Sequence, residues 1–243
     1  MAASDSLTQK AIFSSYNYNV DVTAPGQWVI STKNDNTYAQ DNGTSMASPI
    51  VAGAAALVKL RFPNMTPAQI KAQIVNTAKN IYGTENNQKF LGQLGSGLLD
   101  MRSALDSVVK HAVSMENFVL TDNDDEAYLL DDELELGIEM VNWLGETEGL
   151  IVSLVSLNPK VEVVDALRHF PALKSNARTN NYTDPFKLKV VGDGNTNEPV
   201  VLRLDITDGT FNYQEYVTFI INPDFVNVDV NHVSSTFSSA GQI

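Results

Sequence analysis

A run of small and apolar residues directly follows a glycine turn in this chain and limits the folds that it can adopt. Residues 41–57 read Asp-Asn-Gly-Thr-Ser-Met-Ala-Ser-Pro-Ile-Val-Ala-Gly-Ala-Ala-Ala-Leu. A helix over residues 45–60 would carry apolar side chains on almost every side. Helices of that kind lie in protein interiors. We therefore expect this helix to be buried on all of its faces.

The same run places a serine in the first turn of the expected helix. Backbone N–H groups at a helix N-terminus have no intrahelical partner, and the helix dipole there favours a developing negative charge. Ser45 is therefore a candidate nucleophile beside an oxyanion site. A structural alternative fits the local pattern as well, in which Thr44 or Ser45 merely caps a core helix.

Two further helices are predicted in the first part of the chain, after short strands and turns over residues 12–30. Thr66 is the expected N-cap of the first of these helices, Pro67 is its first helical residue, and Gln69 completes a capping box. Asp100 is the expected cap of the second helix, which should run to about residue 110.

Beyond residue 112 the sequence alternates in the manner of β-strands. The clearest segment, residues 133–140, places leucine, isoleucine and methionine on one face and glutamate on the other. Further strands are expected over residues 150–157, 160–164, 186–191, 200–206 and 211–221. Asp208 and Gly209 should form the turn between the last two. About seven strands in roughly 115 residues suit a two-sheet sandwich of immunoglobulin-like size.

The sequence therefore predicts an α/β part followed by an all-β part. We expect the first domain to occupy residues 1–112 and the β-sandwich residues 113–230. Residues 231–243 would form a linker or the start of a further segment.

Composition excludes several functions. The formal net charge of −13 disfavours nucleic acid as a partner, because phosphate would be repelled. Without cysteine the chain has no disulfide, no thiol nucleophile and no cysteine-based zinc site. The N-terminus has no signal-peptide pattern, and the longest mostly apolar stretch, residues 45–58, is too short to span a bilayer.

The string Gly-Thr-Ser-Met-Ala-Ser-Pro at residues 43–49 resembles the nucleophile motif of the subtilisin-like serine proteases (subtilases, peptidase family S8). The similarity is continuous from about residue 2 to about residue 110. The segments that carry it outside the motif are residues 4–16, 20–26, 30–38, 62–70 and 95–100. This resemblance implies the C-terminal portion of a subtilisin-like three-layer α/β fold.

The resemblance also implies a role for each residue of the motif. Ser45 would accept the acyl group during peptide-bond hydrolysis, and its own N–H would be one oxyanion donor. Thr44 would lie beside the oxyanion site, whereas Asn42 and Met46 would line the cleft around the scissile bond. The protein would be a secreted bacterial endopeptidase that acts on proteins or peptides and uses no organic cofactor.

The residues that would activate Ser45 are not found in this sequence. A serine hydroxyl needs a base, and the base needs an orienting carboxylate. In the subtilases these come from an Asp-Ser/Thr-Gly turn and a His-Gly-Thr-His string, and an upstream asparagine completes the oxyanion site. None of these strings occurs, and His111, His169 and His232 lie outside any family context. We expect a fragment with an internal start that is inactive alone.

Two interpretations of the chain remain open at this point. In the first, the chain is a fragment of a larger, secreted, multidomain bacterial subtilase, and residues 1–110 by themselves would self-associate, exchange elements with another copy, or need a partner chain. A variant of this interpretation has another chain supply the missing half of the protease. In the second, the chain is a non-catalytic interaction module whose working surface is the sandwich, and the protease segment is a relic. An upstream extension that carries the missing motifs would favour the first interpretation.

Acidic turns are the only candidate metal sites. Residues 122–126 and 193–198 gather carboxylate and amide oxygens, and many subtilases bind calcium. Neither segment has the spacing of an EF-hand loop. Solvated turns of an acidic β domain are the more ordinary interpretation. Trp143 is expected to belong to the core rather than to a sugar-binding platform.

Overall fold

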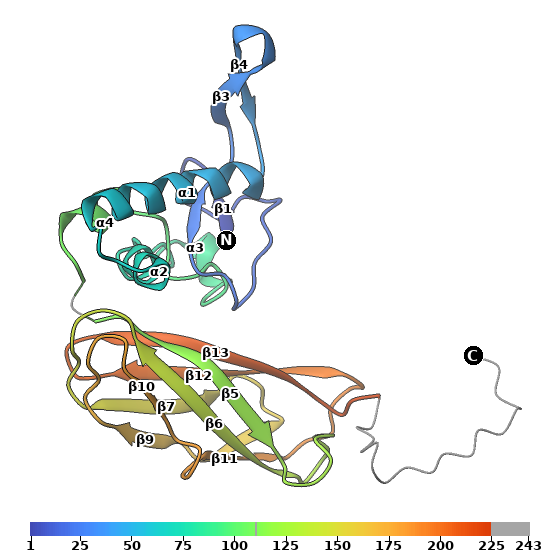
Figure 1. Cartoon of the computed structure of the whole chain (residues 1–243). Coiled ribbons are helices and arrows are strands. Elements are labelled where there is room, and N and C mark those ends of the chain that lie inside the picture. The colour runs from blue at the N-terminus through green and yellow to red at the C-terminus, as the bar shows by residue number, and fades with distance from the viewer. Residues whose placement is uncertain (110, 225–243) are drawn as a thin grey trace, which may run out of the picture.

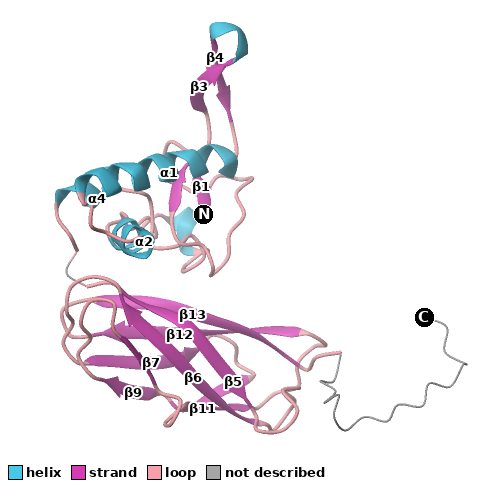
Figure 2. Ribbon diagram, in the orientation of Figure 1, coloured by secondary structure: helices cyan, strands magenta, loops and turns pink. Residues whose placement is uncertain are grey.

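The computed structural model describes residues 1–109 and 111–224. The described residues form an N-terminal part that carries all the described helices and a β part, residues 113–224, that contains strands only (Figure 1, Figure 2).

At the centre of the N-terminal part, a short parallel sheet of β1 (Ala2–Ser4) and β2 (Thr23–Pro25) packs against α1 (Thr44–Arg61). The contact is made by alanines of all three elements, which are buried together. Small side chains let the backbones approach closely, and a Cβ added to Gly26 would lie only 2.6 Å from the Cβ of Ala3.

A hairpin leads into α1. It is formed by β3 (Val29–Lys33) and β4 (Thr37–Asp41), which pair antiparallel around a 3-10 turn at Asn34–Asn36. The hairpin projects away from the rest of the N-terminal part (Figure 1). Its large apolar side chains therefore stay in solvent, with Ile30 69% and Tyr38 75% exposed.

The predicted start of the second helix is confirmed. α2 (Pro67–Asn76) begins with proline, and Thr66 is its N-cap. The Thr66 hydroxyl accepts from the Gln69 N–H at 3.3 Å, and the Gln69 side-chain oxygen accepts from the Thr66 N–H at 3.0 Å. These reciprocal bonds satisfy donors that the helix itself leaves unpaired.

The cap of the last helix is also confirmed, although the helix is shorter than predicted. A one-turn helix, α3 (Glu85–Gln88), comes before it. α4 (Met101–Asp106) follows Asp100, whose carboxylate accepts from the Ser103 N–H at 3.0 Å. The helix ends where Ser107 adopts an extended conformation, so the predicted end near residue 110 is wrong.

The expectation that α1 is buried on all faces is wrong for the described residues. Ala47, Ala54 and Val58 are buried, because they meet the short sheet or the other helices. On the opposite side Leu57 is 49% exposed and Leu60 78% exposed. The reason is that the other described elements pack on one side of this helix only.

The β part consists of two antiparallel sheets. In the first, β6 pairs with β5, β10 and β11, and β11 also pairs with β8; the second has the order β13-β12-β7-β9. The strands are β5 (Val113–Thr121), β6 (Glu133–Asn142), β7 (Leu150–Ser156), β8 (Val161–Asp165), β9 (Leu167–Phe170), β10 (Arg178–Asn180), β11 (Phe186–Val190), β12 (Glu198–Thr207) and β13 (Asn212–Ile221).

Both sheets contribute to one hydrophobic core. Leu136 and Ile138 of β6 are buried in the same cluster as Leu202 and Leu204 of β12, and Phe186 of β11 is fully buried among them. The two sheets therefore hold each other through a shared apolar interior. The immunoglobulin-like topology and the proposed domain boundaries stay predictions.

Most of the predicted strands are confirmed. The apolar face of β6 is buried as expected, and β12 and β13 form a hairpin whose turn contains Asp208 and Gly209, with φ of +88° at the glycine. β5, β9 and β10 were missed. β5 lacks a regular alternation because its register shifts between Met115 and Asn117.

The two parts are joined by packing and by side-chain contacts. Ala112 and Leu144 belong to the same buried cluster as the apolar face of α2, and Trp143 packs against it half-buried. The Gln69 side-chain N–H donates to the Trp143 carbonyl at 2.9 Å. Trp143 thus lies at the junction of the two parts and not in the core that the two sheets share.

Candidate active site at the start of α1

The turn before α1 is fixed by the backbone of the short sheet. The Gly43 N–H donates to the Gly26 carbonyl at 2.8 Å, and the Gly43 carbonyl accepts from Met46 and Ala47 at 3.0 and 3.4 Å. Gly43 has φ of +156°, which few residues with a side chain adopt. The end of β2 and the first turn of α1 therefore have a defined mutual geometry.

Ser45 lies in this first turn and is exposed. Within residues 1–109 and 111–224, its hydroxyl has no hydrogen-bond partner, and neither do the backbone N–H groups of Thr44 and Ser45. An exposed hydroxyl next to two available N–H donors at the positive end of a helix has the geometry of a nucleophile beside an oxyanion site.

The three residues predicted to contact the substrate flank Ser45. Asn42 is exposed, and its side-chain oxygen accepts from the Trp28 N–H at 2.7 Å, which ties the end of the hairpin to its beginning. Thr44 and Met46 are half-buried in the same turn of α1. Their roles toward a substrate stay predictions.

Neither described histidine interacts with Ser45. His111 stacks on Phe211 of the β part, with ring centroids 5.3 Å apart, and its Nε2 atom lies 3.9 Å from Asp208. His169 is a residue of β9. His232 lies outside the described residues. The part of the chain that the structure describes therefore offers Ser45 no imidazole base.

Two carboxylates that precede the motif, those of Asp21 and Asp41, form contacts of their own. Asp21 forms an ion pair with Lys71 of α2 at 2.6 Å. Asp41 accepts from the N–H of Asn42 at 2.9 Å. Neither is placed to orient a base beside Ser45.

In the acidic turns at residues 122–126 and 193–198, carboxylates form hydrogen bonds and an ion pair with nearby residues of the β part. Asp122 accepts from the backbone N–H groups of Asp124 and Glu126. Glu198 pairs with Lys160 at 2.5 Å and also accepts from the Asn195 N–H, and these contacts lower the pKa of Glu198 to about 2. Among the described residues no three His, Asp or Glu side chains gather as a metal site would require.

One ionisable residue at a second location was missed by the sequence analysis. Glu215 lies on β13, in a cleft between the two parts. The signal was present in the sequence, because Glu215 falls on the same face of its strand as Tyr213, Val217 and Ile221. A single glutamate on an otherwise apolar or aromatic strand face is rarely accidental, since burial of a carboxylate is costly.

Comparison with known proteins defines the class of the N-terminal part. Residues 1–97 match the family described as "Subtilase family" (Peptidase_S8). This match contains the Gly-Thr-Ser-Met string and ends before the first strand of the β part. Residues 1–97 are therefore similar to a segment of the subtilase family.

Individual relatives are bacterial proteases. The chain is 43% identical over 104 residues to alkaline elastase YaB of Bacillus sp. (strain YaB), covering 43% of this chain and 26% of that protein. It is 42% identical over 104 residues to subtilisin BL of Lederbergia lenta, covering 43% of this chain and 36% of the relative. The chain thus spans only about a quarter to a third of the length of these relatives.

A solved structure with partial similarity is that of MycP1 from Mycobacterium smegmatis. It is 31% identical, covers 44% of this chain and 29% of that chain, and superposes with a TM-score of 0.36. None of the described helices is both long enough and apolar enough to cross a membrane.

Proposed function

We propose that the N-terminal part is the nucleophile-bearing segment of a secreted bacterial subtilisin-like endopeptidase, which hydrolyses peptide bonds through an acyl-enzyme on Ser45. The observation that carries this proposal is the exposed Ser45 hydroxyl beside the two free N–H groups of the first turn of α1. The protein's substrates would be proteins or peptides, and the reaction needs no organic cofactor.

In the proposed reaction the Ser45 oxygen attacks the carbonyl carbon of the scissile bond. The carbonyl oxygen becomes an oxyanion and accepts a hydrogen bond from the Ser45 N–H, at the positive end of the α1 dipole. Asn42, Thr44 and Met46 would contact the substrate on either side. A base removes the hydroxyl proton and returns it to the leaving amine, after which water hydrolyses the ester.

We propose that this base comes from polypeptide other than the described residues, which would also cover the exposed side of α1. Leu57 and Leu60 lie on that side, and Ile30 and Tyr38 of the hairpin are exposed as well. Burial of one such side chain contributes about 1.5–3 kcal/mol, so a segment that covers several of them would bind stably. One partner would thus complete both the packing of α1 and the catalytic machinery.

The proposal is tested by complementation. The chain is mixed with the part of alkaline elastase YaB that precedes the matched 104 residues, because the family pattern puts the aspartate, histidine and asparagine strings there. We expect a fluorophosphonate probe to label the mixture about 1,000-fold faster than the chain alone, as a positioned general base allows. Labelling is measured by intact mass of the 243-residue chain.

Two serine variants make the complementation experiment specific. Ser45→Ala should abolish labelling in the mixture. Ser48→Ala, an exposed serine one turn further along the same helix, should leave the labelling rate unchanged. If the two polypeptides form a complex that is not labelled, the peptidase proposal fails and the interaction-module interpretation is favoured.

The exposed side of α1 also makes the isolated chain prone to self-association. We expect sedimentation velocity to show a concentration-dependent dimer or larger species, because Leu57 and Leu60 present apolar surface to solvent. The double variant Leu57→Gln, Leu60→Gln should sediment as a monomer at the same concentrations. Wild-type chain that stays monomeric at concentrations of about 100 µM would contradict this expectation.

A further inference from the structure

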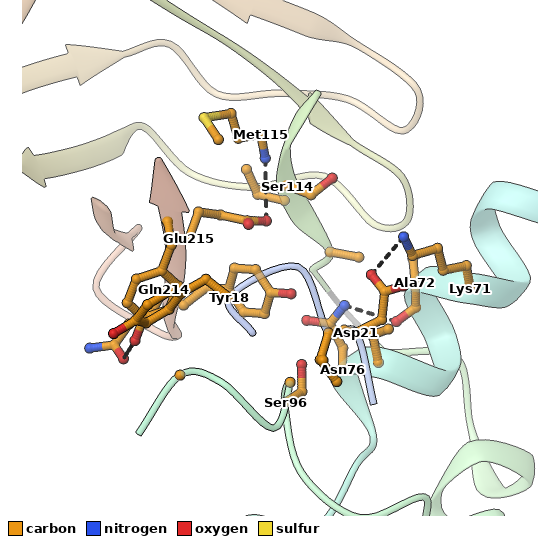
Figure 3. A pocket seen from close by; sticks show the side chains of 18 of the residues that line it. Tyr18, Asp21, Lys71, Ala72, Asn76, Ser96, Ser114, Met115, Gln214 and Glu215 are labelled. Atoms are coloured by element: carbon orange, nitrogen blue, oxygen red, sulfur yellow. Dashed lines mark hydrogen bonds and ion pairs between the residues drawn. The ribbon is translucent and has the colours of Figure 1, made fainter. Parts of the chain in front are cut away.

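A cleft of about 800 Å³ lies between the N-terminal part and the β part. Figure 3 shows its walls, which come mainly from the loop before β2, from α2, from β5 and from β13. A cleft of this size accommodates one amino-acid side chain together with neighbouring residues of a peptide. Its location is separate from the candidate active site, because neither Ser45 nor any other residue of α1 lines the cleft.

Glu215 is the charged group of the cleft that has no counter-ion. Its carboxylate accepts one long hydrogen bond, at 3.4 Å, from the Met115 N–H of β5, a strand of the other sheet (Figure 3). Among the described residues, no lysine, arginine or histidine side chain forms an ion pair with Glu215. An incompletely paired carboxylate that is mostly withdrawn from water is costly.

The other charges that line the cleft are neutralised by partners. Asp21 of the loop before β2 pairs with Lys71 of α2 at 2.6 Å. Glu116 of β5 binds Arg178 through two hydrogen bonds of 2.5 and 2.8 Å. Glu215 is therefore left as the uncompensated negative charge.

The environment of Glu215 tunes its protonation. Burial, with a smaller contribution from the charge of Asp21, raises the pKa of Glu215 to about 7, against the opposing effects of the Met115 N–H and Lys71. The carboxylate is thus charged at pH 8 and largely protonated at pH 6. A bound cation would favour the charged form and would bind more tightly as the pH rises.

Aromatic side chains line the same cleft as this carboxylate. Four tyrosines line the cleft: Tyr18, Tyr82, Tyr213 and Tyr216. The rings of Tyr18 and Tyr216 pack together across the junction, with centroids 4.5 Å apart. Tyrosine faces attract cations, and the net charge of −13 adds a long-range attraction of the same sign. The lining therefore favours a ligand with an apolar stem and a positive end.

We propose that this cleft binds a lysine or arginine side chain of a peptide, with Glu215 as the counter-ion and the tyrosines around the aliphatic stem. The site would hold a basic segment of a substrate or of another protein at a distance from the nucleophile. It does not depend on the assignment of Ser45, because none of its groups takes part in the proposed reaction.

The test compares three blocked tripeptides with the full 243-residue chain by isothermal titration calorimetry. The central residue is lysine, arginine or norleucine, which has the apolar stem of lysine without the charge. We expect the lysine and arginine peptides to bind at least about tenfold more tightly at pH 8 than the norleucine peptide. Their affinity should fall by about tenfold between pH 8 and pH 6 as Glu215 becomes protonated.

Variants locate the binding site. Glu215→Gln has nearly the same shape, and it should remove both the preference for a basic peptide and the pH dependence. Glu116→Gln, at a paired carboxylate of the same cleft, should leave both unchanged. Equal binding of the norleucine peptide, no binding of any peptide, or full binding by Glu215→Gln would each overturn the proposal. The comparison of peptides on the wild-type chain holds even if a variant fails to fold.

Discussion

Gly97→Ala should destabilise the N-terminal part by about 3–6 kcal/mol, which is enough to unfold it at room temperature. A Cβ at this position would lie 2.1 Å from the Lys79 carbonyl oxygen and 2.7 Å from its carbon. Gly97 also has φ of +134°, a conformation that side chains rarely adopt. Both effects act on backbone atoms, so no rotation of a side chain relieves them.

The backbone at residues 97–98 is fixed because it forms hydrogen bonds with Thr23 on one side and with Lys79 on the other. The Gly97 carbonyl accepts from the Thr23 N–H at 2.8 Å, and Leu98 exchanges two 2.8 Å hydrogen bonds with Lys79. Residues 97–98 therefore join β2 to the segment that follows α2. A shift that accommodates a methyl group would break several of these bonds.

Urea unfolding monitored by circular dichroism at 222 nm would measure the effect, because all described helices lie in the N-terminal part. Gly53→Ala is the matched control. A Cβ on Gly53 would meet no atom within 4 Å, and its exposed position inside α1 means that alanine should stabilise the helix by about 0.5–1 kcal/mol. Equal unfolding midpoints for Gly97→Ala and the wild type would show that this backbone is not fixed.

Glu215→Gln should make the chain more stable at high pH and flatten the dependence of its stability on pH. The pKa of Glu215 is about 7 in the folded chain against an ordinary value of 4.5. Between these two values the folded state holds more protons than the unfolded state, so the free energy of unfolding falls as the pH rises. Above pH 7 the full penalty of the buried carboxylate applies.

The size of this penalty follows from the shift in pKa. A shift of this size corresponds to about 3 kcal/mol, and partial exposure of the side chain reduces it to about 1–3 kcal/mol. Unfolding midpoints at pH 5, 7 and 9 would measure it. Glu116→Gln serves as control, because the Arg178 side chain lowers the pKa of Glu116 and this substitution should not stabilise the chain at pH 9. Parallel pH profiles of Glu215→Gln and the wild type would contradict the expectation.

Local signals in the sequence predicted local structure well. The capping box at Thr66 and Gln69 and the cap at Asp100 were correct because a cap is defined by a few neighbouring residues. The alternation of β6 was equally informative, since the period of two fixes which side chains face the core. β5 was missed because its register shift interrupts that period near Met115.

Features that depend on contacts between distant parts of the chain were harder to predict from the sequence. The composition of α1 indicated a helix buried on all sides, yet burial is decided by the elements that pack against it, and the described ones cover a single side. The position of Ser45 in the first turn could be predicted from the motif. The cleft at Glu215 could not, because Asp21, Lys71 and Glu215 come together only through the docking of the two parts.

The side chain of Gln69 links the start of α2 to the β part. Its oxygen closes the capping box, and its N–H group holds the Trp143 carbonyl. A stretching force applied between the two parts would therefore act directly on the first turn of α2. We expect the hydrogen bond from Gln69 to the Trp143 carbonyl to break before the buried cluster around Leu144 separates, because a single hydrogen bond contributes only about 0.5–1.5 kcal/mol.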